Sequence, residues 1–292
     1  MSRADVALLF ICAIWGTTFA LLRDALHAVS PAELVALRFT IAAVVLALIY
    51  FRRLRGWRPE WIQDGLTIGI VVAVGYITQV IGLRTVTASR SAFITSMSIA
   101  FVPFVAFAAL RTRPVMGESL GVLLAVAGLV LFSADAGFSL QKGELWTLAC
   151  AAAFAVQIVV THVAGKRSPA VPISVLQTVV GAAAGWTLVL AGGGATTPAR
   201  AIPWGVLLYL GIVATAFIIV VQTWALARTS SVKAGVLYAT EPIFAAIFAV
   251  SFFGERMTPR ELAGAALILA GVFVSELWRP LRARFAARAT SA

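Results

Sequence analysis

The chain alternates between long apolar stretches and short polar connections. Each stretch runs for about 20 residues, the length that an α-helix needs to cross roughly 30 Å of hydrocarbon. Hydrophobicity within a stretch is continuous, whereas barrel strands would be about 10 residues long with a period of two. The pattern predicts an all-α integral membrane protein with ten transmembrane helices. The predicted spans lie near residues 4–22, 31–51, 62–83, 89–110, 115–134, 145–164, 171–191, 203–226, 232–253 and 260–278.

The fourth and fifth spans match the ninth and tenth without a gap when the chain is displaced by 143 residues. Arg90 then falls on Lys233, and Glu118 on Glu261. The other matched pairs include Leu83 with Leu226, Phe101 with Phe244, Arg113 with Arg256, Gly121 with Gly264 and Gly128 with Gly271. We therefore expect one five-helix unit written twice, in residues 1–139 and 140–280, followed by a basic cytoplasmic tail over 281–292. Because five is odd, the second unit is inverted in the membrane, as in alternating-access carriers.

Two helix starts are marked by capping boxes. Ser30 precedes Pro31 and stands three residues before Glu33, and Thr258 stands in the same way before Glu261. In this arrangement the hydroxyl and the carboxylate each accept a free backbone N–H. Both acids are therefore expected to be structural.

Composition supports the membrane assignment, and charge sets the orientation. The chain is 61% hydrophobic and 12% charged, with a mean hydropathy of +0.97. A net charge of +11 would favour nucleic-acid binding in a soluble protein, but here the basic residues lie in short connections beside apolar helices, where they touch anionic lipid. With the N-terminus inside, 15 Lys and Arg fall on the cytoplasmic side and 7 on the other. This asymmetry predicts that both termini are cytoplasmic.

Polar and aromatic side chains deep in the spans are the candidates for a substrate site, because each costs free energy unless it faces protein or water. They recur at helical spacing on five spans. The predicted substrate-binding residues are Trp15, Tyr76, Gln79, Thr95, Ser98, Gln157, Thr161, Gln222 and Tyr238. For each of them, a hydrogen bond or packing contact between helices is the structural alternative.

Two charged residues lie inside spans. Glu241 precedes Pro242, which lacks an amide hydrogen and so frees carbonyls in the preceding turn. Two interpretations of Glu241 stay open: an acid that couples transport to protons or binds an amine, and a structural partner of a neighbouring helix. Arg38 lies about 10 Å inside the second span. We expect a structural role for it, and binding of a substrate carboxylate is the alternative.

Several motifs together resemble the EamA family of the drug/metabolite transporter superfamily. They are Trp15-Gly16-Thr17-Thr18-Phe19, Leu37-Arg38-Phe39, Glu241-Pro242-Ile243-Phe244, Gly254-Glu255-Arg256, Gly264 and Leu269-Ala270-Gly271-Val272. The resemblance implies two inverted halves around a central cavity, lined by the first, third, fourth, sixth, eighth and ninth spans. It also implies export of aromatic amino acids and other small metabolites from bacteria. One departure is Ser98-Ile99 in the fourth span, where the ninth has Glu241-Pro242.

These observations predict a secondary transporter that moves small metabolites, most of all aromatic or neutral amino acids, out of the cell across the inner membrane by alternating access. The alternative is an exporter of drugs or other small metabolites, with or without proton coupling. An intramembrane enzyme is a remote alternative, because the spans lack a nucleophile with its base and clustered acids. A channel would need charged rings or wide polar faces.

We expect no cofactor and no metal. The sequence has no phosphate-binding loop for ATP. The expected partners are a small-molecule substrate and membrane lipid, and the oligomeric state, monomer or dimer, stays open.

Overall fold

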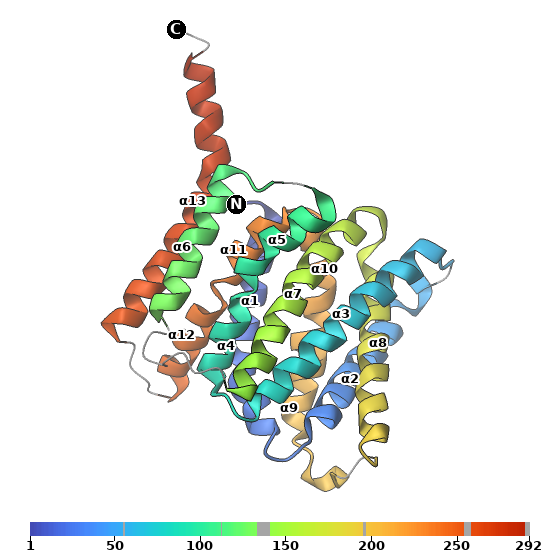
Figure 1. The fold of residues 1–292 in the computed structure, drawn as a ribbon. Coiled ribbons are helices and arrows are strands. Elements are labelled where there is room, and N and C mark those ends of the chain that lie inside the picture. Colours follow the sequence, from blue (N-terminus) through green and yellow to red (C-terminus); the bar gives the residue numbers. More distant parts are fainter. Residues whose placement is uncertain (55, 112, 133–140, 195–196, 254–257, 290–292) are drawn as a thin grey trace.

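The computed structural model describes residues 1–54, 56–111, 113–132, 141–194, 197–253 and 258–289. The described residues form helices and short connections and contain no strand, which confirms the predicted all-α class (Figure 1). Three features predicted from the sequence lie outside the described residues. They are the boundary between the repeats at 139–140, the motif Gly254-Glu255-Arg256 and the last three residues of the tail.

The helices begin and end close to the predicted spans. The first half contains α1 (Arg3–Ala25), α2 (Pro31–Tyr50), η1 (Phe51–Leu54), α3 (Pro59–Leu83), α4 (Ala88–Ser96), α5 (Ser98–Leu110) and α6 (Met116–Phe132). The second half contains α7 (Lys142–Arg167), α8 (Ala170–Ala191), η3 (Ala199–Ala201), α9 (Trp204–Leu208), η4 (Tyr209–Phe217), α10 (Ile218–Leu226), α11 (Ser231–Tyr238), α12 (Glu241–Phe253) and α13 (Pro259–Ala289). Helix α13 runs past the predicted end of the last span at residue 278.

Three predicted spans are not single regular helices. The fourth is broken at Met97 between α4 and α5, and the ninth at Ala239–Thr240 between α11 and α12. The eighth consists of α9, the π-helix η4 and α10. Since Met97 and Thr240 are 143 residues apart, the two breaks occupy the same place in the two halves. Only the second is followed closely by a proline, so Pro242 alone does not explain the breaks.

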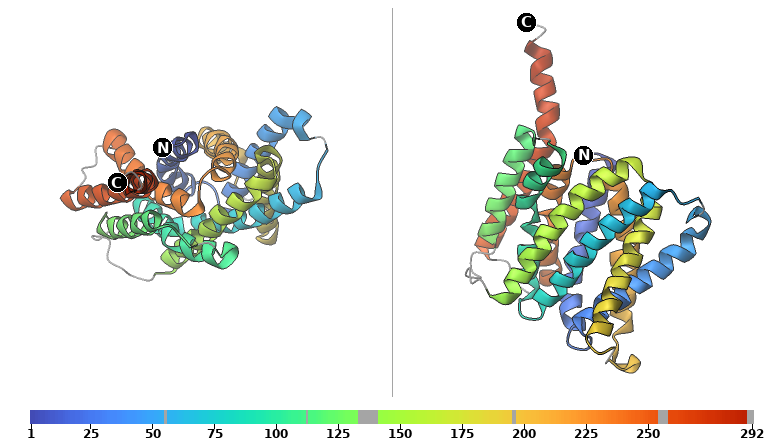
Figure 2. Two further views of the ribbon diagram at one scale, coloured as in Figure 1. Left: turned by 90° about the horizontal axis from the view of Figure 1, so that it is seen from above. Right: turned by 45° about the vertical axis from the view of Figure 1, so that its right-hand side comes forward.

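The number of spans is confirmed only in part. Eight helical segments among the described residues are long and apolar enough to cross a membrane, and Met116–Leu131 in α6 is a shorter apolar helix. Helix α13 packs along α6 at one edge of the bundle (Figures 1 and 2). Their contact is close because a Cβ atom added to Gly128 would lie 2.6 Å from the carbonyl oxygen of Gly264, and one added to Gly271 would lie 2.7 Å from that of Gly121.

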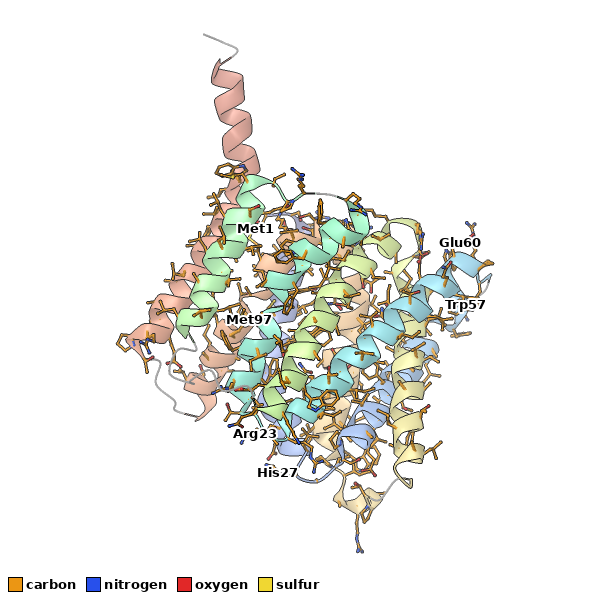
Figure 3. All side chains as sticks on the ribbon, in the orientation of Figure 1. Met1, Arg23, His27, Trp57, Glu60 and Met97 are labelled. Carbon is orange, nitrogen blue, oxygen red and sulfur yellow. The ribbon has the colours of Figure 1, made fainter. Side chains whose placement is uncertain are left out.

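The two halves run in opposite directions through the bundle. Met1 lies at the same end as Trp57 and Glu60 near the start of α3, whereas Arg23 and His27 lie at the other end (Figure 3). Helix α7 begins beside the end of α3 and ends beside its start, where Arg167 pairs with Asp64. Helix α7 is therefore antiparallel to α1. We call the end of the bundle that carries Met1 the N-terminal face and the other end the opposite face.

Both predicted capping boxes are present. The Ser30 hydroxyl accepts the amide of Glu33 at 3.2 Å, and the Glu33 carboxylate accepts the amide of Ser30 at 3.1 Å. Thr258 and Glu261 form the same pair of bonds. Glu33 also accepts hydrogen bonds from the amide and hydroxyl of Thr197 at 3.0 and 2.8 Å, so this cap ties the two halves together.

Candidate functional site

A cavity lies between the two halves of the bundle, with about 670 Å³ of empty space that includes space open to solvent. The lining comes from α1, α2, α3, α4, α5, α7, α10, α11 and α12, so both repeats contribute. The lining residues are Trp15, Thr18, Phe19, Arg38, Val72, Tyr76, Gln79, Thr95, Ser96, Ser98, Phe154, Gln157, Ile158, Ile219, Gln222, Tyr238 and Glu241.

The structure places nearly all of the predicted substrate-binding residues, and the coupling candidate Glu241, at this cavity. Trp15, Tyr76, Gln79, Thr95, Ser98, Gln157, Gln222, Tyr238 and Glu241 all line it. Thr161 does not, but its hydroxyl oxygen accepts a hydrogen bond from the Gln157 amide at 3.3 Å and so supports a lining side chain. The stripes were informative because a helix at the wall of a cavity buries its apolar face in lipid or protein and turns its polar face inward.

A chain of hydrogen bonds crosses the wall formed by the second half. The side-chain amide of Gln157 donates to the Gln222 oxygen at 3.3 Å, and the Gln222 amide donates to the Tyr238 hydroxyl at 3.1 Å. The Tyr238 ring in turn packs against Trp15 with their centroids 5.6 Å apart. Three elements of the second repeat and one of the first therefore hold a single polar and aromatic surface. Gln79, 143 residues before Gln222, occupies the equivalent position in the first half.

Arg38 corrects the expectation that the second span does not reach the site. Its side chain lines the cavity and is 1% exposed. Its Nε donates to the Thr215 hydroxyl at 2.5 Å, and its Nη2 donates to the carbonyl of Ala214 at 3.0 Å. The guanidinium carbon lies 4.5 Å from the centre of the Tyr76 ring. The sequence pattern missed this arrangement because the contacts join residues 176 and 177 positions apart.

Glu241 lies at the break of the ninth span rather than inside a continuous helix. It is the first residue of α12 and lines the cavity with 7% of its surface exposed. The carbonyl of Leu237, freed by the break, accepts hydrogen bonds from the Thr240 amide and hydroxyl at 3.1 and 2.7 Å. The thiol of Cys12 approaches the same oxygen at 3.6 Å. The break therefore satisfies its own carbonyl and leaves the Glu241 side chain at the cavity wall.

The two cysteines occupy equivalent places in the two halves. Cys12 on α1 touches the break of the ninth span, and Cys150 on α7 lies 4.0 Å from the Thr95 hydroxyl, two residues before the break of the fourth span. Both are buried free thiols. This geometry favours a packing role for both cysteine side chains at the helix breaks.

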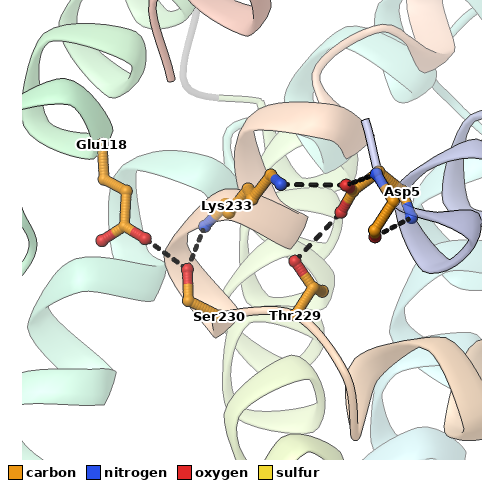
Figure 4. Close-up of polar contacts among 6 residues, drawn as sticks. Asp5, Glu118, Thr229, Ser230 and Lys233 are labelled. Carbon is orange, nitrogen blue, oxygen red and sulfur yellow. Dashed lines mark hydrogen bonds and ion pairs between the residues drawn. The ribbon is translucent and has the colours of Figure 1, made fainter. Parts of the chain in front are cut away.

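An ion pair joins the two repeats at the N-terminal face (Figure 4). The Lys233 ammonium at the start of α11 lies 2.9 Å from the Asp5 carboxylate at the start of α1. Asp5 is fully buried and also accepts from the Thr229 hydroxyl at 3.2 Å and from the Ser2 amide at 2.5 Å. We call these residues the Asp5 cluster. Beside it, the Ser230 hydroxyl donates to Glu118 of α6.

A matching ion pair lies at the opposite face. Arg90 in α4 pairs with Glu144 at the start of α7. Arg90 is 143 residues before Lys233, and Glu144, like Asp5, is the third helical residue and part of a capping box. Each pair therefore joins the first helix of one repeat to the fourth span of the other. The central cavity lies between the two contacts.

The described residues contain no group of three or more His, Cys, Asp or Glu side chains that could hold a metal ion. The cavity instead combines amides, hydroxyls and aromatic rings with Arg38 and Glu241. Such a lining suits reversible binding of a small polar or aromatic molecule.

A helical membrane bundle with two inverted halves around one shared cavity is the architecture of a transporter. Comparison with known families agrees. The model of the EamA-like transporter family matches residues 2–134 and again residues 141–277. The chain belongs to this family, and it carries the family's unit twice.

The chain is also similar to individual proteins along nearly its whole length. An uncharacterized transporter of Archaeoglobus fulgidus is 29% identical over 280 residues, covering 94% of this chain and 86% of the relative. The uncharacterized transporter YoaV of Bacillus subtilis is 22% identical over 296 residues, covering 94% and 97%. A solved crystal structure with 22% identity superposes with a TM-score of 0.76 and covers 95% of this chain and 98% of the other, which shows a shared fold.

Proposed function

We propose that this protein is a secondary transporter that exports small metabolites, aromatic or neutral amino acids first among them, by alternating access. The observation that carries the proposal is the cavity lined from both inverted repeats, with an ion pair between the repeats on either side of it. In the proposed cycle the two halves rock about the cavity, and each ion pair opens in turn. Trp15, Tyr76 and Tyr238 supply rings for a flat or apolar side chain, and the glutamines supply amides for polar groups.

The proposed setting is the inner membrane of a bacterial cell, with both termini cytoplasmic. In this setting the N-terminal face is the cytoplasmic face. Helices α6 and α13 are the fifth and tenth spans. The substrate is a small molecule. The excess of Lys and Arg in the connections of that face supports the orientation. Reporter fusions after Arg167 and after His27 test it: we expect the first on the cytoplasmic side and the second outside. The reverse result would contradict the orientation.

The experiment that tests the function is uptake and counterflow of a labelled amino-acid panel in proteoliposomes. We expect counterflow of aromatic and neutral amino acids that requires no ATP. The Gln222→Ala variant links exchange to the cavity. It removes the amide that connects Gln157 to Tyr238 and should lower the exchange rate. If no amino acid is exchanged by the wild-type chain, the amino-acid proposal fails and a drug or another metabolite becomes the proposed substrate.

Proton coupling through Glu241 is a second candidate property. It is favoured by the position of this acid at the cavity wall, where it forms no ion pair with Arg38, the cationic residue of the lining. We expect Glu241→Gln to abolish any dependence of exchange on an imposed pH gradient while keeping counterflow. Unchanged pH dependence in this variant would leave the structural interpretation of Glu241.

A further inference from the structure

We propose that Arg38 binds the carboxylate of the transported substrate through its Nη1 group. The inference rests on the proposed transport function and narrows its substrate class to molecules that carry a carboxylate. It is carried by one observation: Arg38 Nη1 is buried and has no hydrogen-bond partner among the described residues, although the other two guanidinium nitrogens do.

The guanidinium is held in a fixed position by the eighth span. Its Nε and Nη2 both donate to consecutive residues of η4, Thr215 and Ala214. In this π-helix the Thr215 hydroxyl donates to the carbonyl of Leu210, five residues back, at 2.7 Å. π-Helical segments are rare and are frequent at functional sites.

The Arg38 side chain borders the cavity. Arg38 is one of the lining residues, and the Tyr76 ring against its face is another. Thr215, by contrast, is fully buried and does not line the cavity. Two guanidinium nitrogens therefore donate to residues of η4, and Nη1 is the donor that remains for a ligand.

The charge of Arg38 also lacks a counter-ion. No carboxylate forms an ion pair with it among the described residues, and Glu241, the acid of the same cavity, is not paired with it. A buried, unpaired cation at membrane depth is costly, and arginines in such places mark substrate or ion sites. An arginine prefers carboxylate and phosphate groups. The described residues of the lining include one arginine, no lysine and one acid, so the cavity fits a zwitterion with a single carboxylate better than a doubly charged phosphate.

The test compares acids with their amides, which have nearly the same shape but no negative charge. The probes are L-phenylalanine with L-phenylalaninamide, and 3-phenylpropanoate with 3-phenylpropanamide. Affinity for the purified wild-type protein is measured by ligand-dependent thermal stabilisation, which does not require transport. For at least one pair we expect the acid to bind about 10- to 100-fold more tightly than its amide, the range of a charge-assisted hydrogen bond.

Variants then assign the preference to Arg38. Arg38→Gln should reduce the ratio of acid to amide affinity to near one, and Arg38→Lys should keep part of it. The matched control is Arg84→Gln, at an exposed arginine after α3, which should keep the wild-type ratio. If Arg38→Gln does not fold, Arg38→Lys and the wild-type ratio still decide.

The outcomes separate the two proposals. Preference for 3-phenylpropanoate over its amide, with no binding or exchange of any amino acid, would support the role of Arg38 and refute amino-acid transport. Exchange of amino acids with an acid-to-amide ratio that Arg38→Gln and Arg38→Lys leave unchanged would refute the role of Arg38 alone. If neither acid binds better than its amide, the carboxylate inference is wrong.

Discussion

The ion pair between Lys233 and Asp5 allows a test of whether the Asp5 cluster stabilises the protein and holds the N-terminal face closed. The Asp5 side chain is fully buried and that of Lys233 is 23% exposed. Lys233→Met removes the ammonium and leaves a buried carboxylate supported by Thr229 and Ser2. Breaking a buried pair costs about 3–5 kcal/mol and an exposed pair about 0–1 kcal/mol, so we expect about 1–3 kcal/mol for this half-buried one.

Two measurements follow from this free energy. The melting temperature of the purified protein should fall by about 2–12 °C, if each kcal/mol lowers it by roughly 2–4 °C. If the pair also holds the face closed, its loss should shift the balance towards the state open at that face by about 5- to 150-fold. The second effect is measured with Thr18→Cys, a position in the cavity wall, in a chain whose Cys12 and Cys150 are replaced by alanine. An impermeant maleimide added from the N-terminal face should label it faster when Lys233 is also replaced.

The control is Lys166→Met, which removes the same charge from an exposed position near the end of α7 on the same face. It should leave both the melting temperature and the labelling rate unchanged. If Lys233→Met behaves like Lys166→Met in both assays, the Asp5 cluster neither stabilises the protein nor closes the face, and the reasoning is refuted.

Three other predictions concern the remaining contacts between the halves. Arg90→Gln should speed labelling of the cysteine at position 18 from the opposite face, because it removes the matching ion pair; an effect at the N-terminal face instead would contradict the symmetry. Gly16→Val should lower stability by about 1–3 kcal/mol, measured by thermal unfolding, because a Cβ atom there would lie 2.7 Å from the backbone nitrogen of Ala245. Glu33→Ala should cost about 0.5–2 kcal/mol by the same assay, because its carboxylate accepts from the Ser30 amide and from Thr197; unaltered melting would show that neither contact matters.

Much of the candidate site was predictable from single residues. Tyr76, Gln79, Gln157 and Gln222 stand out because an uncharged polar group inside an apolar span needs a partner. The structure supplies partners for Gln157 and Gln222 from each other and from Tyr238. Helical spacing indicated which face of each span is polar, and therefore which face turns to the cavity. It did not indicate that Thr161 lies behind Gln157 rather than beside it in the wall.

Arg38 and Glu241 show where single-sequence reasoning stops. Both were recognised as charged residues inside spans, but the contact of Arg38 with η4 depends on how α2 crosses the eighth span. Likewise, Glu241 is the first residue of α12 because the ninth span breaks just before it. The fourth span breaks at the equivalent place without a Glu-Pro pair, so that pair alone does not mark the break. The ion pairs of Asp5 with Lys233 and of Arg90 with Glu144 join residues more than 50 positions apart, and nothing in the local pattern links them.

The sequence by itself determined the helical membrane class, the duplicated unit, the family and most of the polar side chains of the cavity. These properties follow from hydrophobicity over about 20 residues, from residue identity at a fixed displacement and from helical periodicity. The tertiary structure alone decided that the second span reaches the site, that one nitrogen of Arg38 lacks a hydrogen-bond partner among the described residues, and that an ion pair joins the repeats at each face. The physical reason is that hydrogen bonds and ion pairs between helices depend on crossing positions and distances, and these arise only when the whole bundle is packed.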